Sequence, residues 1–224
     1  MKEQLKIDFE KILKISNFSE KDIKFKKDQL DKFIENGFPG KRLENWKFLD
    51  LNQIINKNIE NISFFNDYST TNKIDTSIYI DGLEHNKIIF INGRIEKIEF
   101  SYEDKNQIEI YDDIKSEDNF SVKNSLINLN NAFSNKYYKI LVKKGYSIKK
   151  PLIIYHLTNE KMKSKNINLR LDFELEENSS LKLIDFFNDI TDKNFMNIFY
   201  NFKLKNDSIL KNYKIDKFRN NSLR

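Results

Sequence analysis

Residues 168–175, with the sequence NLRLDFEL, decide how we interpret this chain. Every second position is apolar, which is the spacing of a β-strand with one buried face. The polar segment 178–180 predicts a turn, and an apolar run resumes at Leu181. The same order recurs from Asn201, and its turn at 206–208 lies 28 positions after the first. A strand–turn–strand unit at such a period predicts stacked coils of a β-solenoid, although an antiparallel sandwich would give the same alternation.

The chain before residue 138 alternates between helical and strand-like patterns. Apolar residues at helical spacing predict helices over 2–15 and 20–36, and we place the stem of Lys27 along the buried face of the second. Ser19 and Asp22 form a capping-box pattern at its start. Further predictions are a loose connection over 52–77, strands at 77–80 and 87–91, a hairpin turn at Asn92-Gly93, and a helix over 125–133.

Composition limits the class of protein. The chain has 224 residues, of which 39% are hydrophobic and 13% aromatic, so it carries enough apolar material for a core. Its net charge of +5 is concentrated in residues 203–224, which leaves a basic nucleic-acid-binding module open as one interpretation. The absence of cysteine excludes disulfides, thiolate metal sites and cysteine nucleophiles in this chain. With no apolar signal segment and no long apolar run, we expect a cytoplasmic protein that neither spans nor binds a membrane.

No catalytic motif is recognisable in the sequence. The chain has no phosphate-binding GxxxxGK[ST] loop and no GxGxxG pattern. His85 and His156 have no neighbours at metal-ligand spacing, and we expect His156 to have a hydrogen-bonded structural role. The adjacent carboxylates at 112–113 and 176–177 point to opposite faces of any strand, so we interpret them as solvated charges. The prediction is therefore no enzyme activity, no catalytic residue, no metal site and no cofactor-binding site.

Four segments carry a resemblance to a known family. Residues 39–48 contain a proline, an arginine, a glutamate and the only tryptophan in a fixed order, and residues 90–94 read FINGR. Residues 129–133 read LNNAF, and residues 149–156 read KKPLIIYH, followed by segments at 168–170 and 177–181. In this order the segments resemble the SufB/SufD family of iron–sulfur cluster assembly scaffold proteins, the SufD branch more than SufB. The residues of these motifs that we single out are Pro39, Arg42, Glu44, Trp46, Asn92, Gly93, Arg94, Asn130 and Pro151.

The resemblance implies both a fold and a function. The expected fold class is mainly β: an N-terminal helical and α+β region over 1–125, then the first coils of a right-handed parallel β-helix over 126–224, as the N-terminal half of a longer protein. The expected function is a non-catalytic scaffold subunit of a SufBCD-type complex, whose partners are a SufB-like paralogue and a SufC-like ABC ATPase. The complex would handle the iron–sulfur cluster transiently, with no nucleic acid or membrane involved.

Two other functions stay open beside the nucleic-acid module. The chain could be a SufB-like scaffold that carries the cluster itself, which cysteines further along the protein would favour. It could also be an unrelated β-solenoid binding module for glycans or surfaces, which a secretion signal and exposed aromatic ladders would favour.

Overall fold

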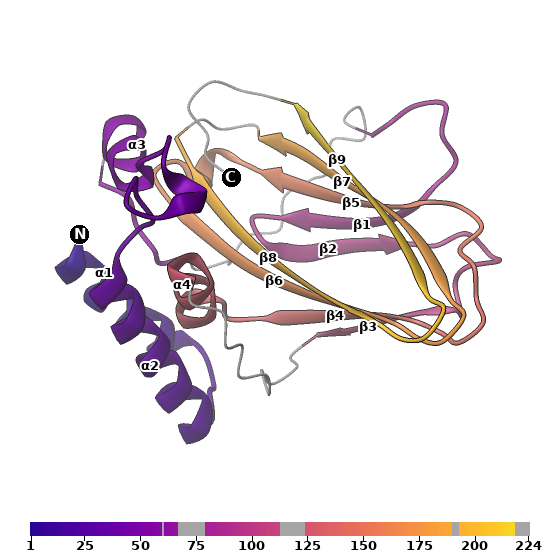
Figure 1. Cartoon of the computed structure of the whole chain (residues 1–224), viewed down its shortest axis with the longest axis horizontal. Helices are drawn as coiled ribbons and strands as arrows, with labels where there is room; N and C mark the ends of the chain where they lie inside the picture. Colours follow the sequence, from indigo (N-terminus) through magenta and orange to yellow (C-terminus); the bar gives the residue numbers. More distant parts are fainter. Residues whose placement is uncertain (60, 67–78, 113–123, 190–192, 218–224) are drawn as a thin grey trace.

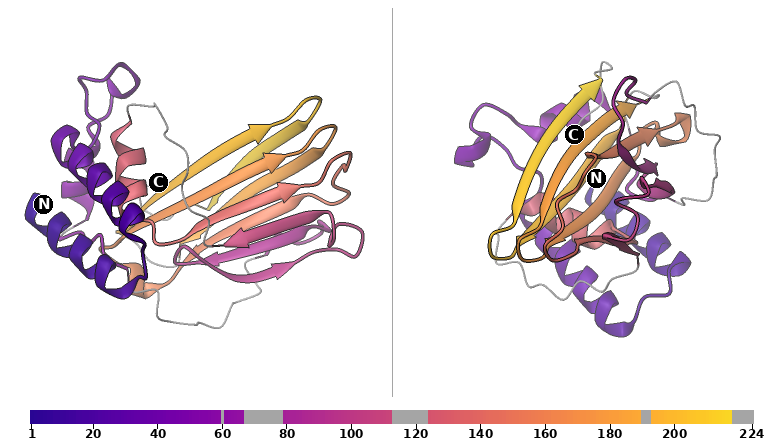
Figure 2. Two further views of the ribbon diagram at one scale, coloured as in Figure 1. Left: turned by 90° about the horizontal axis from the view of Figure 1, so that it is seen from below. Right: turned by 90° about the vertical axis from the view of Figure 1, so that its right-hand side faces the viewer.

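Two β-sheets lie face to face along most of the molecule, and the helices gather at one end of them (Figure 1; Figure 2). This arrangement comes from a computed structural model, which describes residues 1–59, 61–66, 79–112, 124–189 and 193–217. The helices are α1 (Lys2–Ile15), α2 (Glu20–Asn36), α3 (Leu51–Asn58) and α4 (Ser125–Phe133), with short 3-10 turns η1 (Glu44–Trp46) and η3 (Glu160–Met162). The strands are β1 (Asn86–Ile91), β2 (Arg94–Glu99), β3 (Ile108–Asp112), β4 (Tyr137–Val142), β5 (Leu152–Thr158), β6 (Asn166–Leu175), β7 (Ser180–Asp189), β8 (Phe195–Leu204) and β9 (Ile209–Lys217).

Successive strands of the second half alternate between the two sheets. One sheet has the order β2-β1-β5-β7-β9, and the other has the order β3-β4-β6-β8. The pairs β5–β7, β7–β9, β4–β6 and β6–β8 are all parallel, whereas β1–β2 and β3–β4 are antiparallel. Both sheets are therefore mixed.

The predicted fold class is wrong. We expected a mainly β chain that ends in the first coils of a right-handed β-helix, but the described residues form an α/β fold with two mixed sheets and four α-helices. A strictly antiparallel sandwich is also wrong, because the long strands pair in parallel. Alternating apolar residues show that a strand has one buried face, and this holds for any pair of facing sheets. The pattern does not say which strand is the neighbour, so it could not reveal the antiparallel pairs at β2 and β3.

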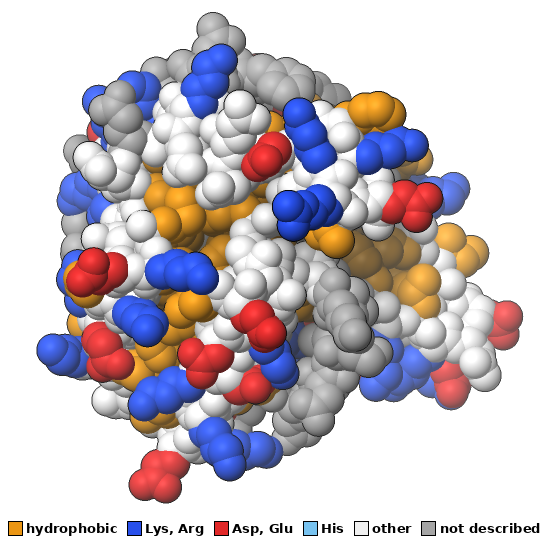
Figure 3. All heavy atoms as spheres, turned by 60° about the vertical axis from the view of Figure 1, so that its left-hand side comes forward, with side chains coloured by type: hydrophobic (Ala, Val, Ile, Leu, Met, Phe, Trp, Pro, Cys, Tyr) orange, Lys and Arg blue, Asp and Glu red, His pale blue; other side chains and the backbone are white. Residues whose placement is uncertain are grey.

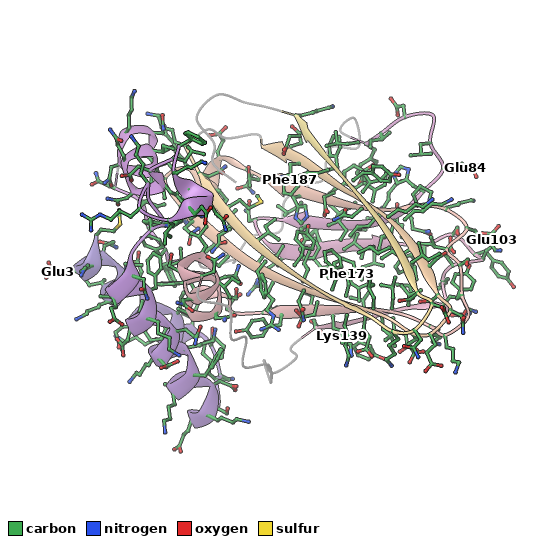
Figure 4. All side chains as sticks on the ribbon, viewed as in Figure 1. Glu3, Glu84, Glu103, Lys139, Phe173 and Phe187 are labelled. Atoms are coloured by element: carbon green, nitrogen blue, oxygen red, sulfur yellow. The ribbon has the colours of Figure 1, made fainter. Side chains whose placement is uncertain are left out.

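The main core fills the space between the sheets. Leu169, Leu171, Phe173 and Leu175 all point into it from β6, as their alternation predicted. Figure 4 shows Phe173 and Phe187 in the space that the two sheets enclose. Apolar burial of this kind contributes roughly 25 cal/mol per Å² of surface removed from water, which makes this layer the main source of stability.

A second core holds the helices against the sheets. The bounds of α1, α2 and α4 match the predicted helices, and the capping box of Ser19 and Asp22 is confirmed. Their apolar faces cluster with Phe195, the first residue of β8, so the helical end and the sheets share this core. The prediction for Lys27 is wrong: it is exposed, and the neighbouring Lys26 is buried instead.

Turns and connections differ more from expectation. The hairpin turn at Asn92-Gly93 is confirmed, with φ angles of 54° and 87° in the left-handed region. Helix α3 occupies part of the segment predicted as a loose connection, while 60 and 67–77 lie outside the described residues. The strand predicted at 77–80 begins outside them as well, and Tyr79 and Ile80 lie in no strand.

Candidate functional site

Among the residues that the structure describes, β8 and β9 are the last strands of their sheets on the same side of the molecule, and each has a described strand neighbour on one side only. The backbone N–H of Lys205 donates to Leu175 of β6, and that of Ile209 donates to Ser179 beside β7. Because successive N–H groups along a strand point to opposite sides, those of even-numbered residues such as Leu204 and Asn212 face the free edges. Two rows of backbone donors and acceptors are thus available for pairing with another strand.

Apolar side chains accompany these edges. Tyr200 and Phe202 of β8 and Leu210 of β9 pack only partly against the core between the sheets. Leu204, two positions after Phe202 on the same face of β8, is 49% exposed, so the apolar row of β8 continues into solvent. Tyr213 of β9 is 58% exposed and lies on the other face of its sheet, opposite Ile184. Partly buried aromatic residues beside a free strand edge are a usual composition for strand addition by a partner protein. We define the strands β8 and β9 with these side chains as the open edge.

The opposite edge of the five-stranded sheet has a different character. Strand β2 carries exposed Glu96 and Lys97, and Glu99 pairs with Lys97 and Lys87. Lysines line β8 and β9 as well, so charge alone does not distinguish the two edges. The aromatic side chains of Tyr200 and Phe202 make the open edge the stronger candidate for a contact surface.

A polar cluster lies inside the core near the open edge. His156 of β5 stacks between the rings of Phe90 and Phe187, with centroid distances of 5.6 and 4.6 Å. Its Nε2 lies 2.9 Å from the hydroxyl of Tyr200 and 3.4 Å from Oδ1 of Asp185. The Tyr200 hydroxyl in turn donates to Asp185. The hydrogen bonding predicted for His156 is confirmed, and burial together with the adjacent Asp185 carboxylate raises the pKa of Tyr200 well above its usual value.

The sequence did not reveal the two partners of His156. Asp185 lies 29 positions after it and Tyr200 lies 15 positions further on, in the facing sheet. The available signal was a carboxylate in the apolar run 181–187, since a charge inside a buried strand needs a partner. The cluster links β5, β7 and β8 across the two sheets, and its three polar groups satisfy one another.

The predicted motif residues near the N-terminus lie at the helical end. Trp46 is half-buried and packs against the helical core, while Arg42 and Glu44 are exposed. The backbone carbonyl of Pro39 accepts the N–H of Leu51 at 3.1 Å. This motif therefore fixes the connection between α2 and α3 and is apart from the open edge.

The other predicted residues are distributed over the sheets. Asn92 lies at the β1–β2 turn with Gly93 and Arg94, and its Oδ1 accepts the N–H of Asn159 at 3.1 Å. Pro151 precedes β5, and its carbonyl accepts the N–H of Asn86 at 2.9 Å. Asn130 of α4 is buried, and its amide donates to the carbonyls of Leu169 and Asn197. The predicted residues, taken together, do not converge on one site.

His85 lies on the outer face of the five-stranded sheet, where its Nε2 meets the Tyr155 hydroxyl at 2.8 Å. Burial lowers the pKa of His85.

Within the described ranges, no three His, Cys, Asp or Glu residues gather as a metal site would require. None of the helices in the described part of the chain is long and apolar enough to cross a membrane. Glu176 and Glu177 face Lys205 and Lys144, respectively.

The chain was compared with known proteins. No protein-family model matches it, and no curated protein sequence matches it.

Proposed function

We propose that this chain is a non-catalytic scaffold subunit of a SufBCD-type iron–sulfur assembly complex, and that it joins its partner through the open edge. The ordered motifs between residues 39 and 181 support the family part of the proposal. The observation that carries the assembly part is the pair of strand edges of β8 and β9, flanked by partly buried Tyr200, Phe202 and Leu210.

Strand addition explains how such a surface would act. If a partner strand paired with β8, one of its backbone carbonyls would accept the outward N–H of Leu204. The side chains of that strand would then cover Tyr200 and Phe202. The partners are then a SufB-like paralogue, paired edge to edge, and a SufC-like ATPase, which supplies ATP hydrolysis in a cytoplasmic complex. The cluster passes through the complex, and this chain serves to position the subunits.

The proposal is tested by affinity purification from the native host through a tag at Met1, read by mass spectrometry. We expect an ABC-type ATPase and a paralogue to be recovered with the chain. The variant Leu204→Pro removes an outward-facing N–H and leaves the Lys205 bond to β6 in place, so recovery of the paralogue should fall at least about tenfold.

A matched control is Glu160→Pro, an exposed position at the start of η3 where proline is tolerated. It should recover both partners at the wild-type level. Recovery of the chain alone would contradict the scaffold function. Equal recovery by Leu204→Pro and Glu160→Pro would contradict the open edge as the contact surface.

A further inference from the structure

Charge alternates from strand to strand across the outer face of the four-stranded sheet. At β3, Glu109 lies on this face, opposite Leu141 of β4. Lys143, directly after β4, meets its carboxylate at 2.9 Å. Lys139, within β4, also points outward, and Figure 4 marks its place on that strand. An acidic strand is thus followed by a basic one.

The alternation continues through β6. Glu174 projects from the same face, and its carboxylate meets Lys139 at 2.7 Å on one side and Lys205, beside β8, at 2.9 Å on the other. Lys205 also reaches Glu176 at 3.6 Å. Hydrogen bonds from Lys139 and Lys205 lower the pKa of Glu174 to about 2. One exception, Arg170, has its guanidinium paired with Asp172 of the same strand at 2.9 Å.

Strand β8 ends the series with positive charge. Lys203 lies in register with Glu174 and is exposed, and Lys205 follows it by two positions on the same face. From β3 to β8 the order is acidic, basic, acidic, basic. The position beyond β8 would continue the order with carboxylates, because opposite charges on neighbouring strands are favourable and like charges are not.

We propose that the partner strand that adds to β8 carries carboxylates on its outward row, opposite Lys203 and Lys205, and apolar residues on its inward row, over Tyr200 and Phe202. This inference rests on the proposed function and specifies the chemistry of the partner. The occupant is a strand of a different subunit. A second copy that paired through its own β8 or β9 would bring lysines against Lys203 and Lys205, and the like charges would repel. Its β3 edge is only five residues long, and the outward carboxylate of that strand, Glu109, is already paired with Lys143.

The test uses two labelled peptides, one alternating Val with Glu and the other alternating Val with Lys, measured by fluorescence anisotropy against the whole chain. We expect the Glu peptide to bind the wild type at least about tenfold more tightly than the Lys peptide. In the double variant Lys203→Glu, Lys205→Glu this preference should reverse. A reversal requires a folded edge, so an unfolded variant would not produce it.

The control is Lys161→Glu, an exposed lysine in η3 that makes the same change of charge away from β8. It should keep the wild-type preference. The inference is overturned if neither peptide binds, if the wild type does not discriminate, or if Lys161→Glu shifts the preference as much as the double variant does. If the double variant still recovers the paralogue from the host, the partner strand does not carry carboxylates opposite Lys203 and Lys205. The proposed scaffold function would then remain valid.

Discussion

At the scale of single residues, Asp104 is the most densely bonded carboxylate that the structure describes outside the helical end. It is fully buried and accepts the Tyr146 hydroxyl at 2.6 Å, the Asn86 amide at 2.8 Å, the Ser101 hydroxyl at 2.9 Å and the Lys149 N–H at 3.0 Å. Burial alone would raise its pKa, but hydrogen bonds led by those of Tyr146 and Asn86 lower it to about 2. Asp104 therefore ties together the first residue of β1, the segment after β2 and the segment before β5.

The substitution Asp104→Asn should reduce the free energy of unfolding by about 2–3 kcal/mol at pH 7, because it removes the charge that these donors stabilise. A carboxylate with a lowered folded pKa contributes stability above its unfolded pKa of about 4, and this contribution is lost as pH falls towards 2. Urea unfolding at pH 7 and near pH 2 should thus show a difference that shrinks in acid. If the difference between Asp104→Asn and the wild type did not change with pH, the charge of Asp104 would not be its source. As a control, Tyr146→Phe removes one hydrogen-bond donor and should lower the free energy of unfolding by only about 1 kcal/mol.

Lys26 is a buried amine, and burial disfavours its charged form. Its side chain is buried, and its Nζ donates to the carbonyls of Asn131, at 3.1 Å, and Ser134, with the Tyr137 hydroxyl at 3.5 Å. Burial lowers its pKa to about 7, although the nearby Asp22 acts in the other direction. In the unfolded chain its pKa is about 10.4, so between these values the unfolded state binds more protons.

The free energy of unfolding should therefore rise with pH from about 7 to about 10, by at most about 1.4 kcal/mol per pH unit from this residue. In Lys26→Met the rise should disappear, while the exposed neighbour Lys27→Met should keep it. Denaturant titrations at several pH values measure this difference. Parallel pH profiles for the wild type and Lys26→Met would show that the amine stays charged when buried.

At the scale of elements, Asn130 determines how α4 sits on the sheet. Its amide donates to Leu169 of β6 at 3.0 Å and to Asn197 of β8 at 2.7 Å, and its Oδ1 accepts the Ser134 hydroxyl at 2.9 Å. Asn130→Ala should lower the free energy of unfolding by about 2–3 kcal/mol, because buried polar groups lose their partners. Asn128→Ala, on a more exposed part of the same helix, serves as the control and should change stability by less than about 1 kcal/mol. Equal effects would contradict a specific role for Asn130.

Local patterns predicted individual elements well. The apolar period of 3.6 residues predicted α1 and α2, and the Asn-Gly pair predicted the β1–β2 turn. These predictions succeeded because such structures depend on residues only a few positions apart. Pairing depends on residues about thirty positions apart, and no pattern in 168–175 indicates the order of the sheets. Helix α3 was missed because its segment is rich in asparagine, a weak helix former whose propensity tertiary packing overrides here.

The candidate site was predicted in part. The alternation from Asn201 predicted a strand, and in the structure this segment belongs to the edge strand β8 and its flank. The residues of the resemblance did not mark this surface, since Trp46 and Pro151 serve the helical end and the start of β5. The alternation of charge between β3, β4, β6 and β8 can be recognised only when the order of the strands in the sheet is known.

At the scale of the whole molecule, the helical end and the sheets should unfold together. Trp46, the only tryptophan, packs on the helical core, and that core includes Phe195 at the start of β8. Tryptophan fluorescence and far-ultraviolet circular dichroism should therefore give the same urea midpoint. In Phe195→Ala, which removes a buried ring at this junction, we expect a loss of about 3 kcal/mol or more and separate midpoints for the two signals. Phe187→Ala, within the sheets, should lower both midpoints together.

The parallel pairs of the sheets also determine how fast the chain folds. Asn166 pairs with Phe195, and Ser180 pairs with Ile209, in each case 29 positions away. Every such ladder must close a long loop before its first hydrogen bond forms, so the average contact joins residues that are distant in sequence. Chains with this high contact order fold in milliseconds to seconds, and each completed strand supplies the edge on which the next one assembles. Refolding should therefore slow when the connections between alternate strands are lengthened, even where the native contacts are unchanged.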